Sequence, residues 1–239
     1  MFMSAGDVLS VERNLLISLL KLTQNGKVMQ NIVNFDAHIP SQLCATLLEK
    51  LKNETIVYVK DGTVEADTSM RIRIAAKAAS LGADIEGLSR FLQWQEFEEI
   101  TAETLNLNGY FTKRTVRFTQ SSQRWEIDVV GCRKPIVVCI DCKHWSRGMH
   151  PSSVSKMAEA QAERVEAFAK FLPSKKHDIP CAKWDRAKFV PVILSLVPTC
   201  AKFYGEIPIV PVLMLQDFIN QLPANVESLH YFSKEFVHL

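Results

Sequence analysis

The sequence predicts a two-domain α+β protein, in which a small and mostly helical domain precedes a larger domain built around a mixed sheet. The order of the predicted helices and strands in each part of the chain leads to this prediction. Residues 1–66 contain three helical stretches and a β-hairpin, whereas residues 84–172 contain a long helix, three strands and a second long helix, with further strands beyond. Leu81-Gly82 ends an alanine-rich helix, so we place the boundary there and divide the chain into residues 1–82 and 83–239.

The helices of the first domain are predicted from apolar residues that recur every three or four positions. This spacing is found over residues 8–22, 27–35 and 41–51. Two β-rich runs then flank Lys60-Asp61-Gly62, and an Asp-Gly pair between such runs favours a hairpin turn. A helix over residues 67–79 completes the domain.

Three helices followed by a hairpin resemble a winged helix-turn-helix module, with residues 41–51 in the position of the recognition helix. Lys50 is the cation that this helix offers to a phosphate. Residues 1–85 carry nine basic and nine acidic side chains, so their charge is balanced. DNA docking and a protein-interaction or dimerisation role are therefore equal alternatives for this domain.

A charged group is predicted at the end of a central strand of the second domain. Residues 136–143 form an apolar run in which Asp141 and Lys143 are two positions apart, so both side chains point to one face of the strand. A shorter run over residues 124–130 precedes it across a hairpin turn and brings a second acid, Asp128, within reach. The two strands thus deliver two acids and one lysine to one place.

A third acid is predicted from the helical pattern over residues 84–107. Its apolar face is formed by Phe91, Trp94, Ala102 and Leu105 and includes Glu98, whereas its polar face carries Glu96, Glu99 and Glu103. A carboxylate that points into the core needs a metal or a hydrogen-bonding partner, which can also be purely structural. Glu98 is therefore the glutamate of this helix that we single out.

This order of elements, with these ionisable residues, resembles the PD-(D/E)xK nuclease superfamily, and within it the Mrr-like restriction endonucleases and archaeal Holliday-junction resolvases. The matching motifs are Phe97-Glu98 with Gly109-Tyr110, Ile127-Asp128-Val129-Val130, and Ile140-Asp141-Cys142-Lys143. The resemblance covers roughly residues 90–170. The chain departs from the pattern twice, because Ile127 stands where a proline is usual and Asp141 where glutamate is frequent.

The resemblance implies a restriction-endonuclease-like αβββαβ core and a DNA endonuclease of restriction-like or structure-specific type. It also implies Mg²⁺, which Mn²⁺ would replace, held by Asp128, Asp141, the backbone carbonyl of Cys142 and Glu98. Lys143 would position the attacking water or stabilise the charge of the transition state. The alternative for Asp128, Asp141 and Lys143 is a cross-strand salt bridge, which leaves the inward Glu98 unexplained.

The helix predicted over residues 152–172 has an apolar stripe that also includes Gln161. A glutamine that faces the sheet can support the site by a hydrogen bond to a metal-bound water, to Lys143 or to a DNA phosphate. A core glutamine with satisfied hydrogen bonds is an equal alternative.

Basic residues are concentrated around the proposed site. Residues 112–147 hold eight Lys and Arg against three Asp and Glu, and such a positive field attracts a polyanion through counterion release. The candidate DNA contacts are Lys113, Arg114, Arg117, Arg124, His144 and Arg147. A solvated basic face is the alternative.

The sequence contains no stretch of about 18 uncharged apolar residues, and its start lacks the pattern of a signal peptide, so we expect no membrane partner and a cytoplasmic location. DNA is the expected partner, and a homodimer is an option because cutting both strands usually requires two sites. A catalytically silent nucleic-acid-binding protein and a multimeric interaction scaffold are the alternatives. The substrate stays open among branched junctions, modified DNA, flaps and RNA.

Overall fold

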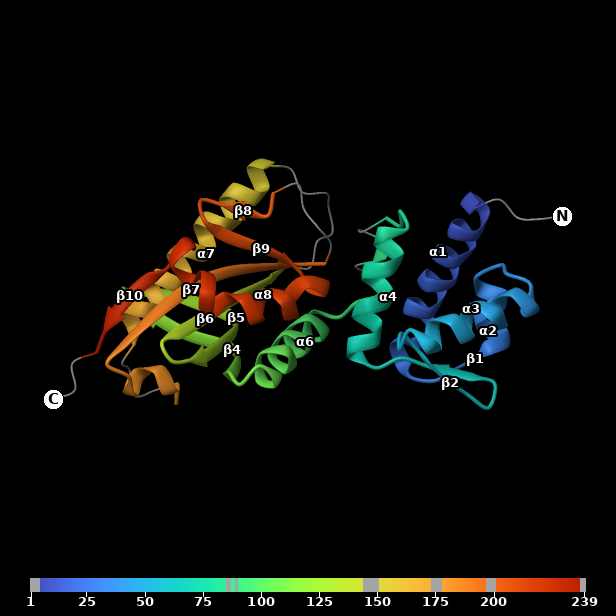
Figure 1. The fold of residues 1–239 in the computed structure, drawn as a ribbon, viewed down its shortest axis with the longest axis horizontal. Coiled ribbons are helices and arrows are strands. Elements are labelled where there is room, and N and C mark those ends of the chain that lie inside the picture. The colour runs from blue at the N-terminus through green and yellow to red at the C-terminus, as the bar shows by residue number, and fades with distance from the viewer. Residues whose placement is uncertain are drawn as a thin grey trace. The chain divides into compact units, whose positions relative to one another are not determined.

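The computed structural model describes residues 5–84, 87–88, 90–143, 151–172, 178–196 and 201–236 (Figure 1). Contacts divide these residues into two compact units, one that includes the residues up to Phe97 and one that includes those from Glu98 onward. Among the described residues, no helix combines the length and the apolar character that a membrane span requires.

The first unit consists of helices and a small antiparallel sheet. Its elements are α1 (Ala5–Leu22), the 3-10 helix η1 (Thr23–Asn25), β1 (Val28–Met29), α2 (Gln30–Asp36), α3 (Ser41–Asn53), β2 (Tyr58–Lys60), β3 (Thr63–Glu65) and α4 (Thr68–Ser80). The sheet has the order β1-β3-β2, so the hairpin predicted around Asp61-Gly62 is confirmed. The prediction of a helix over residues 27–35 is wrong at its start, because Val28 and Met29 pair with β3 as a strand.

Apolar side chains of α1, α3 and α4 form the core of this unit. Along α1 and α3 the buried residues repeat every three or four positions, as predicted, and the core includes Leu15, Leu16, Leu19, Leu20, Leu47, Leu48, Leu51, Ile72 and Ile74. Burial of such stripes supplies most of the free energy that holds short helices in place.

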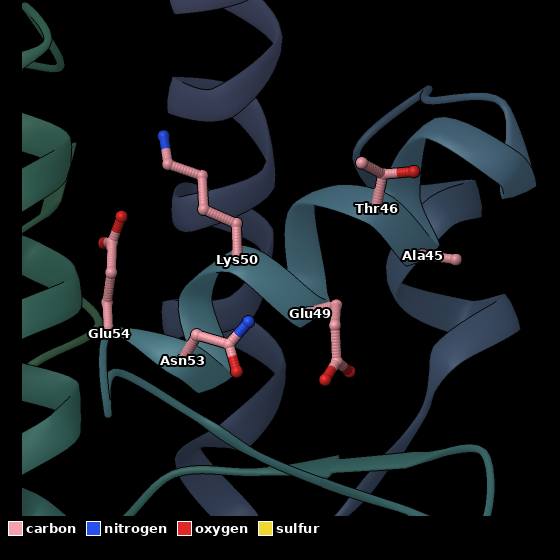
Figure 2. A pocket seen from close by; sticks show the side chains of 6 residues that line it. All are labelled: Ala45, Thr46, Glu49, Lys50, Asn53 and Glu54. Atoms are coloured by element: carbon pink, nitrogen blue, oxygen red, sulfur yellow. The ribbon is translucent and has the colours of Figure 1, made fainter.

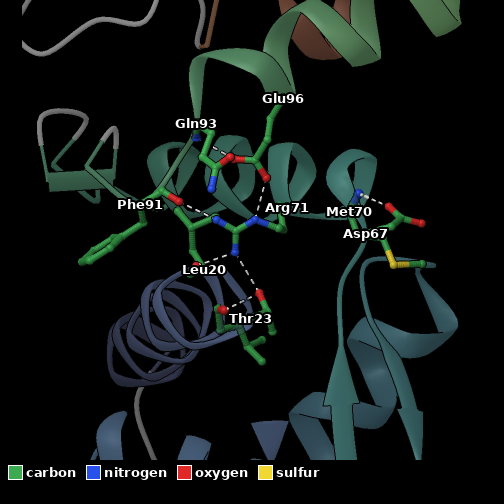
Figure 3. Close-up of polar contacts among 9 residues, drawn as sticks. Leu20, Thr23, Asp67, Met70, Arg71, Phe91, Gln93 and Glu96 are labelled. Carbon is green, nitrogen blue, oxygen red and sulfur yellow. Dashed lines mark hydrogen bonds and ion pairs between the residues drawn. The ribbon is translucent and has the colours of Figure 1, made fainter. Parts of the chain in front are cut away.

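A buried arginine ties three segments of the first unit together (Figure 3). The guanidinium of Arg71 on α4 donates to Oε1 of Glu96 at 2.6 Å and to the carbonyl oxygen of Phe91. It also donates to the carbonyl oxygen of Leu20 at 2.7 Å and to Oγ1 of Thr23 at 3.0 Å, both at the end of α1. Arg71 is only 4% exposed, and these partners offset the cost of burying its charge.

Glu96 corrects the prediction for the long helix before the strands. This helix, α6, runs over Trp94–Leu107 and does not begin at residue 84. Oε2 of Glu96 accepts a hydrogen bond from the backbone N–H of Gln93 at 2.6 Å (Figure 3). That bond is the return half of a capping box, which satisfies a donor that the first helical turn leaves open. Glu96, predicted on a polar face, is therefore buried.

The second unit is built around a large sheet. Its elements are the part of α6 from Glu98 onward, β4 (Phe111–Gln120), β5 (Gln123–Arg133), β6 (Ile136–Lys143), α7 (Pro151–Phe171), η2 (Pro180–Lys183), β7 (Arg186–Ser195), β8 (Phe203–Tyr204), β9 (Ile207–Pro211), η3 (Val212–Met214), α8 (Leu215–Asn225), η4 (Val226–Ser228) and β10 (Phe232–Glu235). The sheet is mixed, as predicted, with the order β4-β5-β6-β7-β9-β8 and with β10 paired to β7. β4, β5 and β6 are antiparallel neighbours, whereas β6, β7 and β9 run parallel.

The two long helices of this unit cover opposite faces of the sheet. α7 packs on an apolar cluster that includes Val130, Val137 and Phe168. Close packing of α6 depends on Gly131, since a Cβ atom at that position would lie 3.0 Å from Cδ1 of Leu105. Val130 and Gly131 are neighbours on one strand and point to opposite faces. The paired parts of β5 and β6 therefore lie between two helices.

Candidate active site

The predicted acids lie where three neighbouring strands are in register. The β4–β5 ladder pairs Arg114 with Val129 and Val116 with Ile127, so the position of Thr115 between them lies across from Asp128. The ladder between β5 and β6 ends with Val129 beside Ile140, so the next position brings Asp128 beside Asp141. Thr115, Asp128 and Asp141 thus form a row across β4, β5 and β6.

Asp128 is a buried carboxyl group with a perturbed pKa. Its side chain is 6% exposed, and Oδ2 accepts a hydrogen bond from the backbone N–H of Cys142 at 2.7 Å. Burial, followed by the negative charge of Asp141, raises the pKa of Asp128 to about 7, although the Cys142 N–H and the Lys143 charge act in the opposite direction. An acid in these surroundings is stabilised in its ionised form by any further cation.

Asp141 is held between two cations. Nζ of Lys143 lies 2.7 Å from Oδ2, and Nη1 of Arg164 lies 3.0 Å from Oδ1. Lys143 shares the face of Asp141, as the two-residue period of a strand predicts. Oδ2 has this ion pair but no partner with hydrogen-bond geometry among the described residues. One oxygen of a buried carboxylate is therefore open to a further ligand.

Arg164 is the site residue that sequence reasoning missed. It lies on α7, where its Nη1 donates both to Asp141 and to Oε1 of Gln161, the latter at 2.5 Å. Its position three residues after Gln161 could have indicated that it faces the sheet, because residues i and i+3 of a helix share a face. An arginine on a helix that also carries acids does not by itself indicate a contact with the sheet.

Gln161 faces the sheet, as its place on the apolar stripe of α7 predicts. It is fully buried, and Nε2 donates to the backbone carbonyl of Cys139 at 2.8 Å. With Oε1 on Arg164, both ends of its amide have partners. The observed hydrogen bonds are those of a satisfied core glutamine, and its influence on the site passes through Arg164.

Glu98 is buried on α6 and reaches β4. It is 7% exposed, and its Oε2 accepts a hydrogen bond from Oγ1 of Thr115 at 3.1 Å. On the same helix, Oγ1 of Thr101 lies 3.7 Å from Sγ of Cys142. The helix face that carries Glu98 thus packs against β4 and against the end of β6.

Burial along α6 partly corrects the predicted helix face. The buried residues are Glu96, Phe97, Glu98, Thr101, Ala102 and Leu105, while Glu99 and Glu103 are exposed as predicted. Trp94, predicted on the apolar face, is 37% exposed because it is the first residue of the helix. Phe91 lies before the helix begins.

The candidate DNA-contacting residues differ in exposure and in whether an acid pairs with them. Lys113 is half-buried, and Arg114 and Arg124 are exposed. Nε of Arg117 is engaged by Oε2 of Glu126 at 2.5 Å. His144 and Arg147 lie outside the described residues.

The candidate recognition helix α3 borders a shallow pocket (Figure 2). Lys50, which lines it, donates to Oε2 of the buried Glu12 at 2.8 Å, and Lys52 of the same helix pairs with Glu49 at 3.0 Å. Both lysines of α3 are thus engaged by acids. A phosphate would have to compete with these carboxylates, so α3 offers a weak surface for DNA.

Two carboxylates with an open oxygen fit a hard divalent cation. Among the described residues, no three His, Cys, Asp or Glu side chains are grouped as a ready-made metal cage. Mg²⁺ does not require one, since one or two carboxylates with waters and substrate phosphates usually suffice. Asp128 and Asp141 supply that number, and because burial raises the pKa of Asp128, a bound cation would stabilise its ionised form.

Residues 89–178 match a family model described as "Restriction endonuclease". The match includes Glu98, Asp128, Asp141 and Lys143. An "Uncharacterized protein" of Archaeoglobus fulgidus is 28% identical over 146 residues, which are 61% of this chain and 98% of that protein.

Two solved structures show partial likeness. The "Protein of Unknown Function AF1548" is 23% identical with a TM-score of 0.27, and the match covers 43% of this chain and 47% of that chain. The protein VC1899 from Vibrio cholerae is 11% identical with a TM-score of 0.37, and the match covers 95% of this chain and 58% of that chain. Since both TM-scores are below 0.5, we infer nothing from them.

Proposed function

We propose, from the premise that residues 89–178 form a domain of the restriction endonuclease family, that the protein is a metal-dependent deoxyribonuclease. The reaction is the hydrolysis of DNA phosphodiester bonds. The proposed catalytic residues are Glu98, Asp128, Asp141 and Lys143. Mg²⁺ is the proposed cofactor, and Mn²⁺ is expected to replace it.

The observation that carries this proposal is the pair of buried acids on adjacent strands. Burial, together with repulsion from the Asp141 carboxylate, raises the pKa of Asp128 to about 7. A fold that needed only stability would not require two acids in one buried place. A bound divalent cation would explain why both positions carry an acid.

When bound, Mg²⁺ supplies the positive charge that stabilises the negative charge developing on the phosphate oxygens. Asp128 and Asp141 are its proposed side-chain ligands, and the backbone carbonyl of Cys142 is a third ligand. Glu98 completes the site directly or through water.

Lys143 and Arg164 have different tasks in this proposal. The Lys143 side chain is 28% exposed, so its ammonium can reach a phosphate while Asp141 holds it, and it positions and polarises the attacking water. Arg164 is held by Gln161 and fixes the orientation of the Asp141 carboxylate through Oδ1. Removal of either cation would leave Asp141 less well oriented.

One observation favours a second function. Lys143 and Arg164 already balance the charge of Asp141, as they would in a catalytically silent nucleic-acid-binding protein that keeps the fold. In that protein the two acids would be structural, and their removal would change stability without any effect on DNA cleavage.

The test is cleavage of a panel of labelled linear, branched and methylated DNAs and an RNA, incubated with Mg²⁺, Mn²⁺ or EDTA. The proposal predicts metal-dependent cleavage of at least one DNA. Binding of DNA without cleavage under every condition would favour the silent protein.

Asp141→Asn is the matched variant for this panel. We expect loss of cleavage with nearly unchanged DNA affinity and an unchanged circular dichroism spectrum, because the amide keeps the shape of the carboxylate but not its charge. Cleavage at the wild-type rate would remove Asp141 from the site, and loss of folding would favour the salt-bridge alternative.

A further inference from the structure

Thr115 is a strained residue in the middle of β4. Its φ angle is +50°, in the left-handed region. A β-branched residue rarely adopts this conformation, because its Cβ substituents crowd the backbone. Where such strain persists, the surrounding structure enforces it, and functional sites are where it concentrates.

The positive φ coincides with a break in the pattern of β4. Burial alternates from Val116 onward, whereas Arg114 and Thr115 are both exposed. The pairs on either side of Thr115 are present in the β4–β5 ladder, but Thr115 itself makes no ladder pair with Asp128. The strand thus departs from regular geometry directly opposite a proposed metal ligand.

The side chain of Thr115 makes a contact that connects the strained backbone to a proposed catalytic residue. Its Oγ1 donates to Oε2 of Glu98 at 3.1 Å. Glu98 comes from α6, whereas Asp128 and Asp141 come from the sheet, so the carboxylate of Glu98 needs a separate contact to hold its orientation. The Thr115 hydroxyl supplies one such contact.

We propose that Thr115 is a positioning residue that orients the Glu98 carboxylate toward the cation site formed with Asp128 and Asp141. The inference deepens the proposed function and rests on it. The hydroxyl does the positioning, and the left-handed backbone brings it into reach of Glu98. Thr115 itself does not contact the reacting atoms.

Three variants separate the hydroxyl from the backbone strain. Thr115→Ser keeps the hydroxyl, Thr115→Val keeps the branched shape and the strain but removes the hydroxyl, and Thr115→Gly removes the hydroxyl and relieves the strain. Thr119→Val is the control, because Thr119 is exposed on the same strand and undergoes the same chemical change. The full chain is used throughout, and the readouts are plasmid DNA cleavage against Mg²⁺ concentration, the rise in Tm on adding Mg²⁺, and Tm in EDTA.

We expect Thr115→Val to lower cleavage at limiting Mg²⁺ by about 10–100-fold, the usual effect of removing a residue that orients a metal ligand. Its rise in Tm with Mg²⁺ should shrink, since that rise depends on metal affinity. Thr115→Ser and Thr119→Val should behave like the wild type. Thr115→Gly should cleave as poorly as Thr115→Val while its Tm in EDTA stays at or above that of the wild type.

Wild-type cleavage and Mg²⁺ response in Thr115→Val would overturn the inference. So would a Thr115→Gly protein whose Tm falls together with its activity, because Thr115 would then serve only the fold. If the wild type cleaves no DNA, the proposed function fails, and the Tm response to Mg²⁺ still decides whether the Thr115 hydroxyl supports metal binding.

Discussion

Burial of the Asp128 carboxyl group makes the stability of the fold depend on pH. Its pKa of about 7 lies above the ordinary value of 3.8, so between these values folded Asp128 in the metal-free protein keeps a proton that the unfolded chain has released. Its contribution to stability is full below about pH 4 and is lost as the pH rises through about 7.

Asp128→Asn removes this titration while its amide oxygen can still accept the Cys142 N–H. In EDTA, the free energy of unfolding of the wild type should fall relative to that of the variant as the pH rises from about 4 to 8, by at most about 4 kcal/mol. Urea denaturation at several pH values measures the difference. Asp178→Asn, at an exposed position, is the control, and parallel curves for the wild type and Asp128→Asn would contradict the raised pKa.

At the scale of elements, α6 carries a buried and an exposed glutamate side by side. Glu98 is buried and bonded to Thr115, whereas Glu99 is exposed. Glu98→Gln should therefore lower the cleavage rate by about 10-fold or more, and Glu99→Gln should leave it nearly unchanged. Initial rates at saturating Mg²⁺ measure both, and equal effects would show that burial on α6 does not identify the site acid.

The hydrogen bonds of Arg71 hold the start of α6 to α4 and to the end of α1. Arg71→Met would leave the Glu96 carboxylate buried without its cation, at a cost of about 3–5 kcal/mol in the free energy of unfolding. Arg73→Met changes an exposed arginine on the same helix and should cost little. Adding Glu96→Gln to Arg71→Met should recover part of the loss in urea denaturation, and no recovery would mean that packing of the Arg71 stem dominates.

For the whole molecule, the question is which unit supplies the phosphate contacts. The lysines of α3 are engaged by acids, whereas residues 112–147 carry eight basic side chains against three acids. Lys113→Gln with Arg114→Gln should flatten the dependence of DNA affinity on salt by about one unit for each cation–phosphate pair that the substitutions remove. Lys27→Gln with Lys60→Gln, in the first unit, should leave the slope unchanged. The reverse result in binding titrations would make the first unit the DNA-docking element.

The sequence by itself determined the features that depend on neighbouring residues. Apolar spacing of three or four identified α1, α3 and α7, richness in alanine identified α4, and the Asp-Gly pair identified the β2–β3 hairpin. The period of two placed Asp141 and Lys143 on one face, because alternation is a property of any strand. Their motifs also sufficed to indicate a restriction-endonuclease-like domain.

Only the tertiary structure decided the features that depend on residues far apart in the chain. Glu96 is buried because Arg71, 25 residues earlier, reaches it, and Asp141 is bonded by Arg164, 23 residues later. The left-handed backbone of Thr115 is likewise absent from local preference, since threonine alone disfavours it, and its hydroxyl bonds Glu98, 17 residues earlier. Local propensity does not predict such contacts. The free energy that stabilises them comes from packing and hydrogen bonds that exist only once the chain has folded.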